Sequence, residues 1–135
     1  MDKIFNILSI AAGIIGGITA SLLGAWDTIL WALIILMLLD YITGIIKAIY
    51  MKTLSSNIGF RGLLRKISIL VIVVLANVLQ VLIGGNAAVR EMVIMFYIAN
   101  EGISILENTA AILPNMPESL KNVLLQLRGD DNADN

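Results

Sequence analysis

The chain has 135 residues, of which 59% are hydrophobic and 14% are charged, and its formal net charge is −1. Soluble domains are about 45–50% apolar and about 25% charged, so this composition favours a one-domain membrane protein. The absence of His and Cys removes the usual catalytic base, thiol nucleophile and most zinc chemistry, and the small net charge gives no field to attract nucleic acid. We therefore expect no enzyme, no metal or other cofactor, and no nucleic-acid partner.

The first apolar segment, residues 4–26, carries no charge and exceeds the roughly 20 helical residues that cross a bilayer. A cleaved signal peptide is the alternative, but the segment is longer than the usual apolar core of about 7–15 residues and no A-x-A-like site follows. Small residues recur every fourth position along it. They predict a face for close helix packing, although Gly and Ala are also simply common in membrane helices. The face comprises Ala12, Gly13, Gly16, Gly17, Ala20, Ser21 and Gly24.

Residues 28–46 form the second predicted span, in which Asp40 is the only charge. Asp40, Thr43, Gly44 and Lys47 follow at spacings of three, four and seven residues, so they share one face of a helix. A carboxylate at the centre of a membrane helix costs about 2.5–3.5 kcal/mol, so it normally faces protein or water. We expect this stripe to be hidden from lipid.

A basic segment follows, with no acidic residue between positions 47 and 66. Short segments rich in Lys and Arg stay on the cytoplasmic side of a membrane, so we expect a cytoplasmic loop and a cytoplasmic N-terminus. Within it, either a short amphipathic helix on the inner leaflet or a plain loop satisfies the pattern. The loop cations beyond Lys47 are Lys52, Arg61, Arg65 and Lys66.

Two further apolar segments complete the membrane region. Residues 67–85 carry no charge, and Asn77 and Gln80 share a face from which they could hydrogen-bond across helices. Residues 92–113 are long enough to span, and we expect a fourth span there, although an amphipathic helix lying at the surface would leave three. Their polar stripe comprises Asn100, Glu101, Ser104, Glu107 and Asn108.

The predicted fold is therefore an all-α integral membrane domain over residues 1–113, followed by a cytoplasmic segment over residues 114–135. This segment is expected to contain a short amphipathic helix from Glu118 to Gly129 and an acidic, disordered tail. The apolar side of that helix comprises Leu120, Val123, Leu124 and Leu127.

Four stretches in this order, LLDYITGIIKA, LSSNIGFRGLLRKI, FYIANEGISILEN and LPNMPESLKNVLLQL, resemble the toxin-secretion and phage-lysis holin family. The most specific features are Asp40, Thr43 and Gly44 taken together with Asn100-Glu101-Gly102. The resemblance implies a small phage-encoded protein that accumulates and oligomerises with itself in the lipid bilayer of the bacterial inner membrane. Holes then release an endolysin, which needs no direct contact, or a toxin. One departure is the acidic tail, because many holins end in a basic one, and the existence of an antiholin partner is left open.

We expect the polar stripes to be hidden in the quiet state and to turn toward water as the wall of a hole. The candidate wall residues are Asp40, Thr43, Lys47, Asn77, Gln80, Asn100, Glu101, Ser104, Glu107 and Asn108. One pairing that would hide them joins Glu107 to Lys47 or Arg65. Two other classes stay open: a small ion- or drug-coupled transporter or channel, and a structural or immunity protein of the membrane.

Overall fold

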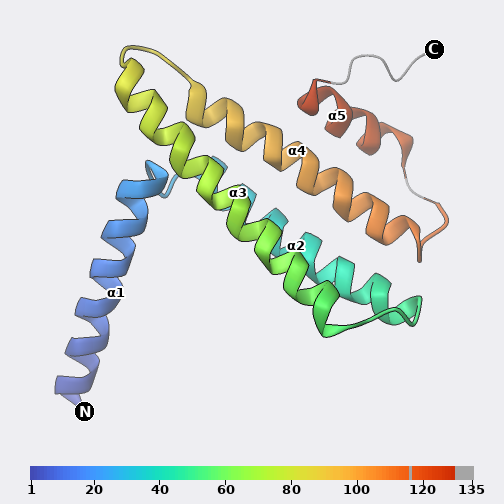
Figure 1. Ribbon diagram of the computed structural model, residues 1–135, viewed down its shortest axis with the longest axis horizontal. Coiled ribbons are helices and arrows are strands. Elements are labelled where there is room, and N and C mark those ends of the chain that lie inside the picture. Colours follow the sequence, from blue (N-terminus) through green and yellow to red (C-terminus); the bar gives the residue numbers. More distant parts are fainter. Residues whose placement is uncertain (116, 130–135) are drawn as a thin grey trace.

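The computed structural model describes residues 1–115 and 117–129, and every regular element in those ranges is an α-helix (Figure 1). The all-α prediction is thus confirmed. The predicted tail over residues 130–135, and the side chains of Leu124 and Leu127, lie outside what the structure describes. The helices are α1 Asp2–Leu23, α2 Thr28–Tyr50, α3 Ser56–Ile83, α4 Val89–Ala110 and α5 Glu118–Arg128.

Two polar side chains start the second and third helices. Asp27 accepts a hydrogen bond from the backbone N–H of Leu30 at 3.1 Å, and Ser55 accepts one from the N–H of Ile58 at 3.2 Å. Each bond satisfies one of the N–H groups that a helix start leaves without a partner. No proline interrupts the chain between Ser55 and the end of α3, so the helix runs on unbroken into the apolar segment.

The basic segment is therefore mostly helical, so the plain-loop alternative is wrong; the helix found there is the start of α3 and not a separate short one. Lys47 lies in the last turn of α2, and only Lys52 lies in the connection between α2 and α3. Arg61, Arg65 and Lys66 lie inside α3. The cause is the cap at Ser55, which starts the helix well before the first residue of the apolar run.

Helices α2, α3 and α4 pack side by side, with α3 antiparallel to the other two (Figure 1). Their shared core consists of apolar residues from all three helices: Leu30, Leu33, Met37, Ile69, Val73 and Ile94. Helix α5 packs against α4. In contrast, α1 contacts the bundle only near its own C-terminal end and diverges from it toward the N-terminus (Figure 1).

Three helices, α1, α2 and α3, are long and apolar enough to cross a membrane. Their outward faces carry large apolar side chains such as Ile35, Ile42, Val71 and Leu75. Helix α4 is not among the three, because charged and amide side chains interrupt its apolar run. The chain is a membrane protein by this measure, and the fourth span stays a prediction.

No other helix of the described residues packs against the centre of the small-residue face predicted on α1, although the Trp26 indole N–H donates to the Gly16 carbonyl at 3.3 Å. A Cβ atom added at Gly13, Gly16 or Gly17 would meet nothing within 4 Å. Gly24 differs from the prediction, because it ends α1 with φ +97° and an added Cβ would lie 2.5 Å from Arg90 Nε. Its role is thus a turn against a side chain of α4 and not a ridge of the helix. Ala12 and Ser21 are exposed, and Ala20 is half-buried.

Candidate functional site

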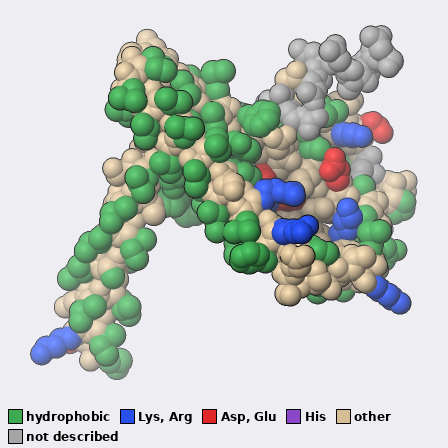
Figure 2. Space-filling model, viewed as in Figure 1, with side chains coloured by type: hydrophobic (Ala, Val, Ile, Leu, Met, Phe, Trp, Pro, Cys, Tyr) green, Lys and Arg blue, Asp and Glu red, His purple; other side chains and the backbone are tan. Residues whose placement is uncertain are grey.

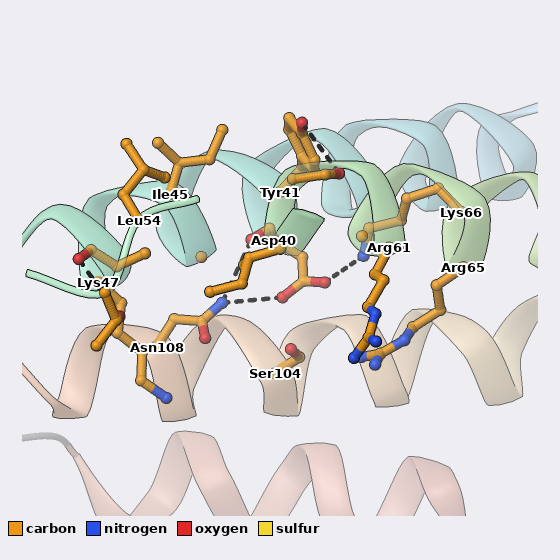
Figure 3. Close-up of a pocket in the computed structure, with 16 residues that line it drawn as sticks. Asp40, Tyr41, Ile45, Lys47, Leu54, Arg61, Arg65, Lys66, Ser104 and Asn108 are labelled. Carbon is orange, nitrogen blue, oxygen red and sulfur yellow. Dashed lines mark hydrogen bonds and ion pairs between the residues drawn. The ribbon is translucent and has the colours of Figure 1, made fainter. Parts of the chain in front are cut away.

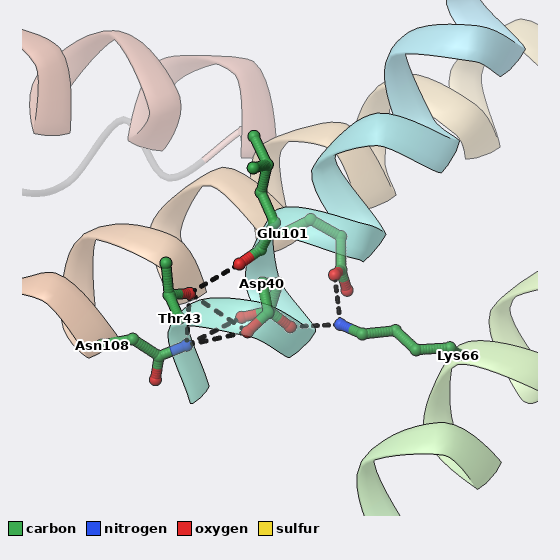
Figure 4. A network of polar contacts seen from close by, with 6 residues as sticks. Asp40, Thr43, Lys66, Glu101 and Asn108 are labelled. Atoms are coloured by element: carbon green, nitrogen blue, oxygen red, sulfur yellow. Dashed lines mark hydrogen bonds and ion pairs between the residues drawn. The ribbon is translucent and has the colours of Figure 1, made fainter. Parts of the chain in front are cut away.

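A charged network lies inside the bundle, where α2, α3 and α4 face one another (Figure 4). The Lys66 ammonium of α3 donates to the carboxylates of Asp40 in α2 and Glu101 in α4. Lys66 is 9% exposed and Glu101 is 4% exposed. Each charged group has an opposite charge beside it, and the three side chains tie the three helices together at one level.

Amide and hydroxyl groups extend this network toward the C-terminal end of α4. The side-chain amide of Asn108 donates to Asp40 Oδ1 and to Thr43 Oγ1, both at 3.1 Å. The Thr43 hydroxyl in turn donates to the backbone carbonyl of Leu39 at 2.8 Å. No buried side-chain nitrogen or oxygen of the described residues is left without a hydrogen-bond partner, as a network in a low-dielectric interior requires.

Two cavities border the network. One, of about 370 Å³, lies near the connection between α2 and α3, and we call it the basic pocket because Lys47, Arg61 and Arg65 line it beside Asp40 (Figure 3). Ser104 and Asn108 of α4 also line it. The second cavity, of about 310 Å³, continues along α3 and α4 and is lined by Asn100, Glu101 and Ser104 among others.

A second polar cluster joins α1 to the bundle at the opposite end. Arg90, which is 3% exposed, donates to Asp27 Oδ2 at 2.8 Å, to the Leu23 carbonyl at 2.6 Å and to the Ala25 carbonyl at 3.0 Å. The two carbonyls belong to the end of α1 and the turn that follows it, where a helix leaves carbonyls without intrahelical partners. The guanidinium of Arg90 therefore holds the end of α1 and the turn after it against the start of α4.

The two amides predicted to bond across helices do so in this cluster. Asn77 donates to the carbonyls of Ser21 and Leu22 at 3.4 and 3.1 Å, and Gln80 Oε1 accepts from the backbone N–H of Arg90 at 3.0 Å. The predicted cross-helix bonding is confirmed. Asn77 and Gln80 lie far from the Lys66 network along α3, so a shared wall between them stays a prediction.

Comparison with known proteins identifies the family of this chain. Residues 17–129 match the bacteriophage holin family. The chain belongs to that family. A "probable holin" of Bacillus phage phi105 is 34% identical over 99 residues, which are 73% of each chain. An uncharacterised 14.9 kDa protein of Clostridium perfringens is 43% identical over 128 residues, 94% of this chain and 97% of the relative.

Another relative of this family member, an uncharacterised protein of Listeria monocytogenes, is 40% identical over 110 residues, 82% of this chain and 79% of the relative. No solved structure matches the chain. The matched region contains α2, α3 and α4 in full, so the Lys66 network and the basic pocket both lie within the part that defines the family.

Several predicted site residues of this holin-family chain are brought together, but their partners differ from the prediction. Asp40, Thr43, Glu101 and Asn108 meet around Lys66, a residue that the sequence predicts in the cytoplasmic loop. Glu107 is exposed and forms no ion pair with Lys47, Arg65 or any other described residue. The predicted pairing of Glu107 is therefore wrong, because Glu107 lies on the exposed side of α4 while Glu101 is turned inward.

Arg90 was missed, although the sequence contains a signal for it. It is the only cation between Lys66 and Lys121, and Asp27 is the only charge between Lys3 and Asp40. A topology with the basic segment inside puts both in turns on the outer side of the membrane. A lone acid and a lone cation in apolar surroundings on the same side favour each other as partners.

Acid is expected to loosen the contact of Asp27 and Arg90 at the end of α1, which we call the junction. Hydrogen bonding to Arg90, together with the Leu30 N–H, holds the pKa of Asp27 below its ordinary value of 3.8 against the opposing effect of burial. A lowered pKa stabilises the fold above the ordinary value, and that stabilisation is lost as the pH falls through the lowered pKa. The junction should thus be intact at neutral pH and loosen only below about pH 4.

Tryptophan emission measures this response, since the chain has two Trp residues and their rings lie 5.3 Å apart at this junction. The Asp27→Asn variant keeps a side chain that can cap α2 but cannot titrate. It should show no change in emission across the acid range. An equal acid response in wild type and variant would contradict the assignment to Asp27, and the neighbouring Glu91, 3.6 Å from Arg90, would be the group to replace next.

Proposed function

We propose that this chain is a holin that accumulates in the bacterial inner membrane, oligomerises and opens holes through which an endolysin or a toxin leaves the cell. The family match over residues 17–129 supports the class. The observation that carries the mechanism is the burial of Asp40 of α2 and Glu101 of α4 against Lys66 of α3. An apolar exterior around a charged interior suits a protein that must stay closed in lipid and later face water.

We propose that α4 crosses the membrane as a fourth span. Its 22 residues extend over about 33 Å as a helix, enough for the bilayer core. It runs beside α2 (Figure 1). Of its four charged residues, Arg90 and Glu101 are turned into the protein, while Glu91 and Glu107 lie near its two ends. With the connection between α2 and α3 in the cytoplasm, the N-terminus and the C-terminal end of α4 lie on the cytoplasmic side as well.

Hole formation follows from the same arrangement. The small residues of α1 with open space beside them, among them Gly13 and Gly17, give copies of the chain a surface for close packing as they accumulate. A rearrangement that separates α2, α3 and α4 exposes Asp40, Lys66 and Glu101. These charges are far more stable in water than in hydrocarbon, so they favour a water-filled wall once copies have assembled.

The test is induced expression of the full chain in a bacterium that contains a large cytoplasmic reporter enzyme. Membrane potential and reporter activity in the medium are followed together. Abrupt depolarisation with release of the reporter after a delay is expected. Depolarisation without release would indicate a channel or transporter, and no change in either would indicate a structural or immunity protein; both would contradict the proposal.

Two glutamates of α4 provide a matched pair for the wall itself. The Glu101→Gln variant removes a buried partner of Lys66, whereas Glu107→Gln makes the same chemical change at an exposed position of the same helix. We expect Glu101→Gln to change the onset time of release and Glu107→Gln to leave it close to wild type. Equal onset times for all three proteins would contradict a wall built from the buried stripe.

A further inference from the structure

The basic pocket has more positive charge than the protein itself compensates. Of the cations that line it, Lys66 is engaged by Asp40 and Glu101. Lys47, Arg61 and Arg65 form no ion pair with any acid of the described residues. Figure 2 shows Lys and Arg side chains gathered on the bundle, away from its junction with α1. The pocket is therefore suited to an anion from outside the chain.

The three uncompensated cations come from two walls. Arg61 and Arg65 are four residues apart on α3 and so share one face of that helix, while Lys47 lies on α2. Guanidinium groups bind phosphate oxygens with two parallel hydrogen bonds, and an ammonium adds a point charge. The one carboxylate of the pocket, Asp40, already accepts hydrogen bonds from Lys66 and Asn108.

Glycines and a tyrosine shape the space between these walls. Tyr41 packs against α3 where Gly59 and Gly62 lie, and a Cβ added at either glycine would be 3.3 Å from its ring or hydroxyl. The Tyr41 hydroxyl donates to the Gly59 carbonyl at 3.4 Å. This close approach of α2 and α3 fixes one side of the pocket, which holds about 370 Å³, room for a headgroup-sized ligand.

Apolar side chains also line the pocket, which decides between two sources of phosphate. Ile45, Leu54 and Ile58 lie in its wall, and Leu54 and Ile58 continue onto the exposed apolar surface. A free phosphate ion would gain nothing from these residues, whereas the glycerol and first acyl carbons of a lipid would be buried against them. Basic pockets between membrane helices on the cytoplasmic side are known to suit anionic lipid headgroups.

We propose that the basic pocket binds the phosphodiester headgroup of an anionic phospholipid of the inner leaflet, such as phosphatidylglycerol or cardiolipin. A choline or ethanolamine headgroup would bring its own ammonium among three unpaired cations, with no free carboxylate to receive it. The inference rests on the proposed membrane placement, with the connection between α2 and α3 in the cytoplasm. The lipid would join α2 to α3 beside the Lys66 network.

The test measures lipid binding to the purified full chain in uncharged detergent by native mass spectrometry. Short-chain phosphatidylglycerol, phosphatidylcholine with the same acyl chains, and glycerol phosphate are titrated separately. Phosphatidylglycerol should bind at least about tenfold more tightly than phosphatidylcholine, because each Lys or Arg near a net anionic headgroup contributes about fivefold and the choline cation cancels that charge. Glycerol phosphate should bind far more weakly than phosphatidylglycerol. Equal binding of the two lipids, or binding of glycerol phosphate as tight as that of the anionic lipid, would overturn the proposal.

Charge-matched variants show whether the site is the pocket. Arg61→Gln with Arg65→Gln should weaken phosphatidylglycerol binding by about 10- to 30-fold. Lys3→Gln with Lys121→Gln removes the same net charge from exposed positions outside the pocket and should change binding by less than about twofold. An equal loss of lipid binding in both pairs of variants would mean that the overall charge of the protein attracts the lipid and that the pocket is not its binding site. If the glutamine pair fails to fold, Arg61→Lys with Arg65→Lys, which keeps the charge but loses the paired hydrogen bonds, should still weaken binding measurably.

This inference and the proposed function fail separately. Reporter release without lipid selectivity would overturn the lipid site and leave the holin function standing. Lipid selectivity without any release would overturn the holin function and support the site.

Discussion

Replacing Lys66 with methionine is expected to lower the free energy of unfolding by about 3–5 kcal/mol. Methionine fills a similar volume, but it leaves Asp40 and Glu101 as neighbouring carboxylates without their shared cation. Breaking a buried ion pair from one side is costly because the remaining charge stays buried and uncompensated. Loss of helical signal on titration with a denaturing detergent measures the effect on the purified chain.

The control for this variant is Lys52→Met, which makes the same chemical change in the connection between α2 and α3, where the side chain is exposed and lines neither cavity. It should alter stability by less than about 0.5 kcal/mol. If Lys66→Met were as stable as Lys52→Met, the network between the three helices would not exist in the folded protein.

Neutralising the carboxylates should restore much of the loss. In the triple variant, Asp40→Asn and Glu101→Gln accompany Lys66→Met, so no charge remains inside the bundle. The largest part of the loss in Lys66→Met is the uncompensated buried charge, which the triple variant no longer contains, and the Asn108 amide keeps an acceptor at position 40. A triple variant less stable than Lys66→Met alone would mean that the carboxylates are held by groups other than Lys66.

The helices of this holin-family protein follow closely from its sequence. Each apolar run produced a helix, and Asp27 and Ser55 start α2 and α3 as capping residues should. The burial of Asp40 and Glu101 was also predictable, because a charge in an apolar helix must face protein or water. These features could be predicted because they depend only on short stretches of sequence and on whether lipid or water surrounds them.

The partners of the buried charges could not be predicted in the same way. The positive-inside rule places a run of cations at the cytoplasmic surface but does not say which one turns inward. Lys66 lies inside α3, on the side of that helix that faces Asp40 and Glu101. The neighbouring Arg65 points in another direction around the helix and lines the basic pocket. The direction of α1 depends on contacts with Asn77 and Arg90, which are distant from it in sequence, and no local pattern encodes it.

Replacing Arg90 with glutamine is expected to release α1 from the bundle. The substitution removes the ion pair with Asp27 and the donors to the carbonyls of Leu23 and Ala25. Since Asp27 remains 40% exposed to solvent, the cost should fall somewhat below that of a fully buried pair, at about 2–4 kcal/mol. The loss should appear at the junction and leave the packing of α2, α3 and α4 intact.

Spin labels measure this directly, because the chain has no Cys and two can be introduced cleanly, at Ala12 in α1 and Val81 in α3, both exposed. The distance distribution between the labels should be narrow in the otherwise wild-type chain and several times broader with Arg90→Gln. Lys121→Gln, a loss of one exposed cation on α5, should leave it narrow. Asp27→Asn should give an intermediate width, because Arg90 keeps its two carbonyl acceptors. A narrow distribution with Arg90→Gln would mean that the contacts of Asn77 with Ser21 and Leu22 are enough to direct α1.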